Sequence, residues 1–264
     1  MADFAAKDVQ ALRQSTGAGM MDAKKALTEN GGDPEAAAKW LREKGLAKAA
    51  GRTDRDNSQG TVAVAQTGGV AAIVELKCET DFVAKSDQFT SLVQEIAGVV
   101  VAEGEAAVAQ KADAIDDLKL VLKENIELGQ VVRIDAPEGH VLDSYVHRQE
   151  GRGVNGVIVE LDGATVEVAH DVAVHIAFTK PSALRREDVA ESEVAEERAT
   201  LESITRAEGK PEAALDKIVE GRLSSWFKDR VLLEQGFVKD DKTSIKSMLG
   251  DADVVRFAQV VVGS

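Results

Sequence analysis

Residues 60–77, GTVAVAQTGGVAAIVELK, decide the fold of this chain. Two β-prone runs, Gly60–Thr67 and Val70–Lys77, flank the pair Gly68-Gly69. A two-residue glycine link between such runs is typical of a β-hairpin, because the favoured tight turns need positive φ angles. Farther along, the apolar residues recur at helical spacing, at Phe89, Leu92, Val93, Ile96, Ala97 and Val100. The sequence therefore predicts an antiparallel hairpin followed by an amphipathic helix.

The rest of the chain continues this mixture of strands and helices. A second helix is expected through residues 115–126, three strands at 131–134, 141–146 and 154–161, and a third helix at 168–177. A short helix at 245–249 and a strand at 254–262 end the pattern. The order β-β-α-α-β-β-β-α indicates α+β layers with antiparallel sheets and not alternating βα units.

Residues 1–52 form a separate module by composition. They hold nine Lys and Arg against seven Asp and Glu, a net charge of +2, whereas the whole chain carries −14. Three short helices are predicted, the third capped by Asp33-Pro34 and ending near Gly45. Three helices of this length bury only a thin core, which fits a docking module better than a catalytic one. Residues 53–59 are interpreted as a linker.

Residues 180–230 are predicted to form an antiparallel helical hairpin. Twelve acidic and ten basic residues crowd this segment, and its apolar stripes are narrow. Glu208-Gly209-Lys210-Pro211 interrupts the helical pattern between the two arms. Narrow stripes favour a coiled-coil-like hairpin that protrudes, and a helix pair lying flat on the core is the alternative.

Composition excludes several classes of protein. The single Cys78 excludes an internal disulfide framework and a thiolate zinc cluster. His170 and His175 are five residues apart and do not form a helical metal pair, so no metal site is expected. A charge of −14 opposes general nucleic-acid binding. The N-terminus lacks the apolar run of a signal peptide, and no apolar stretch reaches membrane-spanning length. We therefore expect an acidic cytoplasmic protein with no membrane partner.

One glycine motif raises the question of a nucleotide cofactor. Residues 151–156, GRGVNG, match G-x-G-x-x-G, but β-like runs lie on both sides of them. The dinucleotide fingerprint needs a helix after the motif, so a glycine-rich strand connection is favoured. No P-loop motif is present, and the histidines form no catalytic set with Cys78 or a serine. No cofactor and no enzymatic activity are expected.

Three polar turns contain apolar or titratable residues that could contact a partner. Phe82 lies in the polar turn at Glu79–Val83, and by spacing alone it is either a core anchor or an exposed apolar plug beside a carboxylate. Met20 and Met21 either fill the small helical core or form an adaptable contact surface. His147 follows a predicted strand and is read as a surface histidine on residue physics alone.

At these turns the chain resembles a known family. LRQSTGAGMMDAKKAL (12–27) and KCETDFVAKSDQF (77–89) are similar to motifs of bacterial elongation factor Ts, the guanine-nucleotide exchange factor for elongation factor Tu. The similarity continues in the same order through DSYVHR (143–148), VAVHIAFTKP (172–181), GKPEAALDKIVEGRL (209–223) and GFVKDDKTSIKSML (236–249). The loop after His147, RQEGRGVNG, is longer than in the family pattern.

The resemblance implies a domain organisation. An N-terminal module similar to ubiquitin-associated domains (1–52) would precede a two-part α+β core, with 60–138 as its N-terminal half. Residues 139–179 and 231–264 would form the C-terminal half, and 180–230 a protruding coiled-coil insertion.

The resemblance also implies a partner and a set of contact residues. Asp81 and Phe82, flanked by Thr80 and Val83, would enter elongation factor Tu near its magnesium and phosphate site and promote GDP release. His147 would contact another domain of the partner, and docking would use Arg13, Met20, Met21 and Lys24. A homo-oligomer and a two-to-two complex with elongation factor Tu both stay open. A non-exchanging adaptor that uses the N-terminal module and the hairpin is the alternative function.

Overall fold

A computed structural model describes residues 4–264, so the first three residues of the predicted module lie outside it. The module consists of α1 (Ala6–Thr16), α2 (Met20–Glu29) and α3 (Pro34–Ala50). Asp33 caps α3 by accepting hydrogen bonds from the backbone N–H groups of Glu35 and Ala36 at 2.9 and 3.2 Å. The small core of the module consists of Val9, Leu12, Ala23, Ala26, Leu27 and Ala37.

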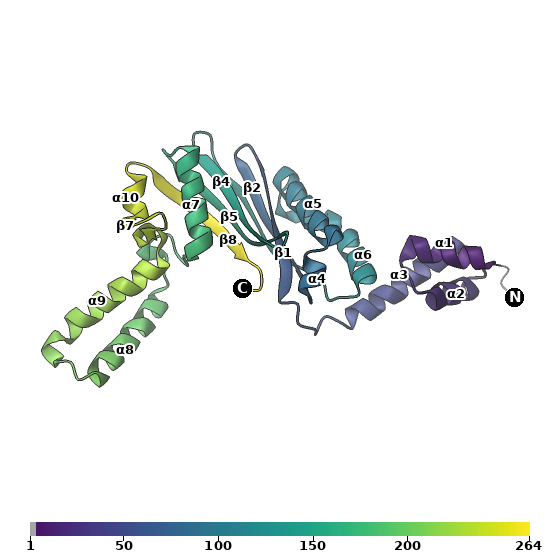
Figure 1. Ribbon diagram of the computed structural model, residues 1–264, viewed down its shortest axis with the longest axis horizontal. Helices are drawn as coiled ribbons and strands as arrows, with labels where there is room; N and C mark the ends of the chain where they lie inside the picture. Colours follow the sequence, from purple (N-terminus) through teal and green to yellow (C-terminus); the bar gives the residue numbers. More distant parts are fainter. Residues whose placement is uncertain (1–3) are drawn as a thin grey trace.

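The predicted end of the third helix near Gly45 is wrong. α3 continues to Ala50, and Gly45 lies where α3 crosses α6 (Ala112–Leu122). A Cβ atom on Gly45 would come within 2.4 Å of Leu120 Cδ2, so the glycine permits close packing of the two helices. Arg42 on α3 forms ion pairs with Asp113 at 2.9 Å and with Asp117 at 2.7 Å. The module is thereby attached to the core (Figure 1).

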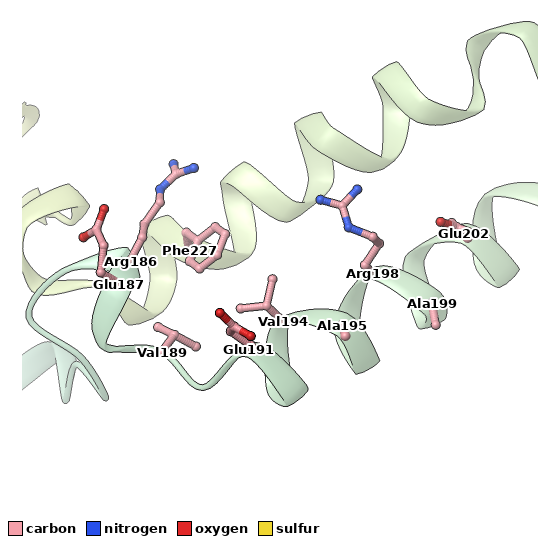
Figure 2. A pocket seen from close by; sticks show the side chains of 10 residues that line it. All are labelled: Arg186, Glu187, Val189, Glu191, Val194, Ala195, Arg198, Ala199, Glu202 and Phe227. Carbon is pink, nitrogen blue, oxygen red and sulfur yellow. The ribbon is translucent and has the colours of Figure 1, made fainter.

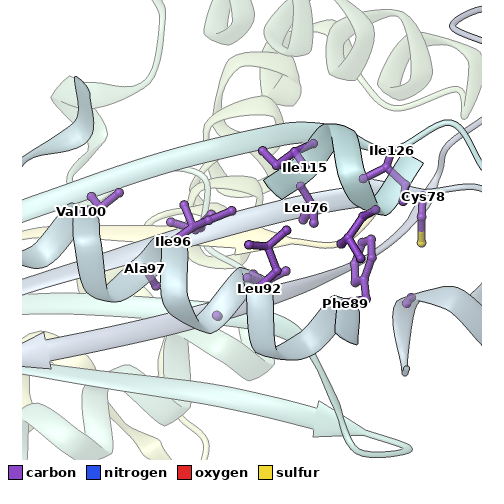
Figure 3. Close-up of a cluster of buried hydrophobic side chains, with 14 of the residues drawn as sticks. Leu76, Cys78, Phe89, Leu92, Ile96, Ala97, Val100, Ile115 and Ile126 are labelled. Carbon is purple, nitrogen blue, oxygen red and sulfur yellow. The ribbon is translucent and has the colours of Figure 1, made fainter. Parts of the chain in front are cut away.

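The N-terminal half of the core is an antiparallel sheet in the order β1-β2-β3, formed by Gln59–Thr67, Val70–Cys78 and Glu127–Asp135. Gly68 takes the positive φ angle, 57°, that the predicted tight turn between β1 and β2 requires. The helix α5 (Asp87–Glu103) covers one face, and the 3₁₀ helix η1 (Glu105–Lys111) connects it to α6. Figure 3 shows the buried side chains of α5 packed with Leu76, Cys78, Ile115 and Ile126.

The C-terminal half repeats this arrangement with a second antiparallel sheet. Its strands β4 (Val141–Gln149), β5 (Arg152–Asp162) and β8 (Asp253–Val261) lie in the order β4-β5-β8. The helix α7 (Val166–Thr179) packs on one face. The same core includes residues of η3 (Leu232–Glu234), β6 (Gly236–Phe237) and α10 (Ile245–Leu249), and β7 (Asp240–Ser244) pairs with β6.

The two sheets pack against each other through an inter-sheet cluster of buried side chains: Val62, Ala71, Ile73, Ile134, Leu142, Ile158 and Val260. The glycine motif belongs to this contact. A Cβ atom on Gly156 would lie 2.6 Å from Val62 Cγ1, and one on Gly153 would lie 2.1 Å from the Val62 carbonyl oxygen. Both glycines are in β5, which continues as a strand to Asp162 and not as a helix. Close approach of β1 therefore accounts for these two glycines, and Gly151 takes a positive φ angle of 86° in the turn before β5.

The charged segment forms a hairpin of two long helices, α8 (Glu191–Ala207) and α9 (Glu212–Arg230), preceded by the 3₁₀ turn η2 (Arg186–Asp188). Figure 1 shows the hairpin projecting from the C-terminal half, so the protruding arrangement is confirmed. Its base is fixed by a cluster consisting of Ala183, Val189, Leu223, Trp226, Phe227 and Val231. The predicted α+β class with antiparallel sheets is confirmed, and the likeness of the module to ubiquitin-associated domains stays a prediction. Over residues 4–264, every helix is too short or too polar to cross a lipid bilayer.

Candidate functional site

The turn between β2 and α5 folds as a one-turn helix, α4 (Asp81–Ala84). Thr80 is its N-cap, and the Thr80 hydroxyl accepts a hydrogen bond from the Val83 N–H at 3.3 Å. Ala84 is buried and Val83 is packed against the core of the N-terminal half. The apolar second half of α4 therefore anchors the turn to the core.

Glu124, just beyond α6, clamps the start of this turn. One carboxylate oxygen accepts the backbone N–H groups of Glu79 and Thr80 at 3.0 and 3.1 Å, and the other accepts the Thr80 hydroxyl at 2.6 Å. In return, Glu79 accepts the backbone N–H of Asn125 at 2.7 Å. Charge-assisted hydrogen bonds of this kind are stronger than neutral ones. The start of α4 is therefore held by two reciprocal links to residues 124–125.

Phe82 points away from the core, with 75% of its surface exposed. Of the two interpretations that spacing left open, the structure rejects the core anchor. Val83 and Ala84 already occupy the side of α4 that faces the core. Phe82 is on another face because successive residues of a helix are turned by roughly 100°. An exposed aromatic ring thus stands on a turn whose backbone is fixed.

Lys85 connects the side chains of this turn. Its ammonium group lies 3.1 Å from Asp81 Oδ2, 3.1 Å from Glu150 Oε2 and 4.8 Å from the centroid of the Phe82 ring. The hydrogen bond from Lys85 lowers the pKa of the Asp81 carboxyl below its ordinary value of 3.8. Hydrogen bonds to Asp81 and then to Glu150 raise the pKa of the Lys85 ammonium group. Both shifts favour the charged forms of Asp81 and Lys85 at neutral pH.

His147 is exposed near the end of β4, where the pairing with β5 shifts register between His147 and Arg148. It lines a groove of about 590 Å³ together with Tyr145, Arg152 and Phe178. Phe178, on α7, is 78% exposed, and spacing alone had placed it in no candidate site. The groove thus combines a histidine, a cation and an exposed aromatic ring.

The N-terminal candidates form a third surface. Met20 and Met21 are 48% and 75% exposed at the start of α2, and neither belongs to the core of the module. Arg13 and Lys24 are also exposed. Met20 and Lys24 are four residues apart and share a face of α2. Figure 1 places this module at the opposite end of the core from the hairpin.

Comparisons with known proteins show which family this chain is similar to. The family model described as elongation factor TS matches residues 79–264. The elongation factor Ts of Arthrobacter sp. (strain FB24) is 44% identical, with all of both chains covered. The chain belongs to the elongation factor Ts family. The factor of Kineococcus radiotolerans is 45% identical over 96% of both chains. That of Thermobifida fusca is 43% identical over all of this chain and 99% of its own.

The match to the elongation factor Ts family model begins at Glu79, the residue that pairs with Asn125, and it includes Thr80–Val83 and His147. The N-terminal module precedes the matched region and is covered by the full-length relatives. The structure therefore presents the candidate residues of this family member on three surfaces. One is α4, one is the groove beside His147, and one is the start of α2 with Arg13.

The concavity shown in Figure 2 is separate from all three surfaces. It has a volume of about 620 Å³ at the base of the hairpin and is lined by Val194, Arg198 and Phe227 among others. Arg186 stacks on Phe227 at 4.6 Å and forms an ion pair with Glu234. The Arg186 guanidinium is thus neutralised within the protein. Within residues 4–264, no three His, Cys, Asp or Glu side chains gather closely enough to hold a metal ion.

Sequence reasoning missed Glu124 and Glu150 at this site. They lie 44 and 65 residues from Thr80 and Lys85, their respective partners, so no local spacing connects them to the turn. The one available signal was the polar stretch Lys123-Glu124-Asn125 between a predicted helix and a strand. Lys123 ends α6 in the left-handed conformation, with a φ angle of 61°, and this chain reversal precedes Glu124.

Proposed function

We propose that this chain promotes GDP release from elongation factor Tu by inserting Phe82 near the magnesium and phosphate site of that protein. Membership of the elongation factor Ts family supports a role in translation elongation as the exchange factor for elongation factor Tu. The observation that carries the insertion step is the position of Phe82. It is exposed at the tip of a turn that Glu124, Val83 and Ala84 hold in place.

Phe82 has the physical properties of an insertion residue. An aromatic ring has two rotatable side-chain bonds, so it provides a large contact area at a small cost in conformational entropy. Full burial of a Phe side chain stabilises a complex by roughly 1.5–3 kcal/mol. A tenfold change in a binding constant corresponds to about 1.4 kcal/mol. Burial of Phe82 alone can therefore change the binding constant by between about one and two powers of ten.

Exchange follows from linkage between two binding equilibria. A factor that binds nucleotide-free elongation factor Tu more tightly than the GDP form must weaken GDP binding by the same ratio. In this proposal Asp81 holds the displaced segment of the partner beside Phe82. Arg13, Met20, Met21 and Lys24 supply docking affinity, and His147 supplies a second contact. The process forms no covalent bond, so the chain acts through binding free energy alone.

The test is stopped-flow release of a fluorescent GDP from elongation factor Tu at saturating concentrations of this protein. Phe82→Ala is expected to slow release by roughly 10- to 100-fold, which corresponds to the burial free energy of the ring. Val166→Ala is the matched control, since Val166 is an exposed apolar residue outside the three surfaces. Release by Phe82→Ala at the rate of the unchanged protein would contradict the insertion step.

The same assay distinguishes the adaptor alternative. A non-exchanging adaptor would bind elongation factor Tu, because the module and the helical hairpin would still dock. It would leave the rate of GDP dissociation unchanged at every concentration. Binding measured by calorimetry together with an unchanged GDP release rate would therefore replace the exchange function with the adaptor function.

A further inference from the structure

We infer that Lys85, anchored by Glu150, is a positioning residue that holds Phe82 and Asp81 in the arrangement required for insertion. This inference rests on the function proposed above. It concerns two residues that the proposed contact set does not include, and it is drawn from their geometry.

α4 cannot orient Phe82 by its own stability. It has four residues, and an isolated helix of this length is unstable in water because nucleation is unfavourable. The Glu124 clamp fixes the backbone at Glu79 and Thr80, and its hydrogen bonds go to these two residues. The ring is 75% exposed and lies 4.8 Å from the Lys85 ammonium group. A cation at this distance from an aromatic face is attracted to it.

Lys85 is itself held from two sides. Asp81 is four residues before it, and Glu150 comes from the C-terminal half of the core; each carboxylate is 3.1 Å from the ammonium nitrogen. An unpaired lysine samples many rotamers, whereas two ion pairs confine this one. The Lys85 side chain is also largely covered, with 30% of its surface exposed. The cation that faces Phe82 therefore has a defined position.

Glu150 connects this position to the second candidate surface. It occupies the tip of the β4–β5 hairpin, three residues after His147, in a left-handed conformation with a φ angle of 52°. Next to it, Arg152 donates hydrogen bonds to the Gly60 carbonyl at 2.8 Å and to Gln59 Oε1 at 3.0 Å. These bonds attach the hairpin tip to β1. Lys85 and Arg152 together fasten the loop after His147 to the half of the core that carries Phe82.

The mechanistic consequence concerns the order of events at the partner. With Lys85 in place, the ring and the Asp81 carboxylate are arranged before elongation factor Tu arrives. Without the charge, both side chains must be ordered during insertion, and the entropy lost slows the insertion step. Initial docking uses the module and the groove, so it is affected much less. We therefore expect a lower GDP release rate at saturation. The concentration of this protein that gives half-saturation should not change.

The experiment measures both quantities for Lys85→Met, Lys85→Arg and Glu150→Gln. Lys85→Met removes the charge and retains the aliphatic length. It is expected to lower the saturated GDP release rate about three- to tenfold, with the half-saturating concentration unchanged within about twofold. Lys85→Arg keeps both ion pairs, so its saturated release rate should be within about twofold of that of the unchanged protein. Glu150→Gln should lower the saturated release rate about two- to threefold. This second variant tests the inference even if Lys85→Met does not fold.

The matched control is Lys111→Met. Lys111 pairs with Glu95 at 3.1 Å, has a similar exposure to Lys85, and lies outside the candidate surfaces. A double-mutant cycle with Phe82→Ala then separates the two proposals, since coupled residues give non-additive effects. If Lys85 acts through Phe82 and Asp81, Lys85→Met slows Phe82→Ala less than it slows the unchanged protein, because only the contribution through Asp81 is left.

The outcomes distinguish failure of the proposed function from failure of the inference. If Phe82→Ala releases GDP as fast as the unchanged protein, both the insertion function and the inference fail. If Phe82→Ala is slow but Lys85→Met is normal, the inference alone fails. The inference also fails if Lys85→Met has its full effect in the Phe82→Ala background. An unchanged rate for Glu150→Gln would remove Glu150 from the anchor.

Discussion

At the scale of single residues, Glu124 shows how one carboxylate can determine the shape of a contact surface. Its two oxygens accept three hydrogen bonds, from two backbone N–H groups and one hydroxyl at the start of α4. Removing an acceptor leaves partly buried donors unpaired, which costs about 1–3 kcal/mol. The orientation of Phe82 depends on this backbone. Glu124 therefore determines the shape of the contact surface at α4, although it is not one of the proposed contact residues.

We expect Glu124→Ala to lower the free energy of unfolding by about 1–3 kcal/mol and to slow GDP release at saturation. Urea denaturation and stopped-flow release measure the two effects. Glu95→Ala is the control, since Glu95 pairs with Lys111 at the surface and lies outside the clamp. Equal stability of Glu124→Ala and the unchanged protein would show that the clamp does not hold the turn.

The residue scale also shows where sequence reasoning ends. The segment Thr80–Val83 was identified from its motif, but the direction of Phe82 was left open. That direction depends on the N-cap at Thr80 and on the packing of Val83 and Ala84, and these follow from the tertiary fold. Glu150 could not be assigned to Lys85 because the contact requires the two halves of the core to be packed together.

At the scale of elements, the two sheets approach each other closely at glycines of β5. The Gly156 backbone lies against Val62 and Ile73, where a Cβ atom would be 2.6 and 3.1 Å from their side chains. Adding a methyl group to a packed contact of this kind forces neighbours to move. The separation of β1 and β5 thus depends on the absence of a side chain at this position.

Gly156→Ala is expected to destabilise the protein by about 1–3 kcal/mol, measured as the shift of the urea unfolding midpoint. Gly98→Ala is the matched control: Gly98 lies within α5 and a Cβ atom there meets nothing within 4 Å. This control is expected to stabilise by about 0.5–1 kcal/mol through helix propensity. Equal shifts of the two variants would contradict the steric explanation.

His175 on α7 predicts a pH dependence of stability. It is fully buried; its Nε2 atom lies 3.0 Å from Gln235 Oε1, and its Nδ1 atom accepts the Val238 N–H at 3.3 Å. Burial lowers the pKa of His175 below 6.5. Below that pH the unfolded chain binds a proton that the folded chain does not, so stability decreases as the pH falls from about 6.5 toward the folded pKa.

The measurement is the free energy of unfolding between pH 7.5 and pH 5.5, about one unit on either side of the ordinary histidine pKa. His175→Gln should reduce the loss of stability over this range, whatever its effect at neutral pH. Ile176→Val is the control and should leave the slope unchanged, since Ile176 is buried on the same helix and carries no titratable group. A slope that His175→Gln does not alter would assign the pH dependence to other groups.

Elements differed in how well the sequence predicted them. The hairpin of β1 and β2 and the helix at Ile245–Leu249 followed from strong local patterns. β6 and β7 were not predicted, because Gly236–Phe237 is only two residues long and Asp240–Ser244 lacks apolar alternation. The continuation of α3 beyond Gly45 depends on its packing with α6, which no local pattern records.

At the scale of the whole molecule, stability is distributed unevenly. The N-terminal module has six buried apolar residues in its core, three of them alanines, whereas the N-terminal half of the core buries large side chains of β2 and α5. Two ion pairs from Arg42, a hydrogen bond from Arg52 to the Lys119 carbonyl, and the packing of α3 on α6 attach the module to the core. A thin core provides little apolar burial, so local opening there is easier.

Hydrogen–deuterium exchange should therefore be fastest, among the helices and strands compared, in α1 and α2 and slowest in β2 and α5. Mass spectrometry of peptic fragments at neutral pH measures this difference. Arg42→Ala should accelerate exchange in α3 and α6 without altering β2, because it removes both ion pairs to α6. Equal protection of α1 and β2 would mean that the module and core open as one unit.

The face-to-face packing of the two sheets has a consequence for multivalent binding. Phe82 and His147 are carried by different halves of the core, and the inter-sheet cluster packs these halves against each other. For a partner that touches both residues, the second contact forms within an existing complex, at an effective concentration set by the rigid frame. Two modest contacts then multiply their contributions to affinity, and loosening the sheets would weaken binding with both contact residues intact.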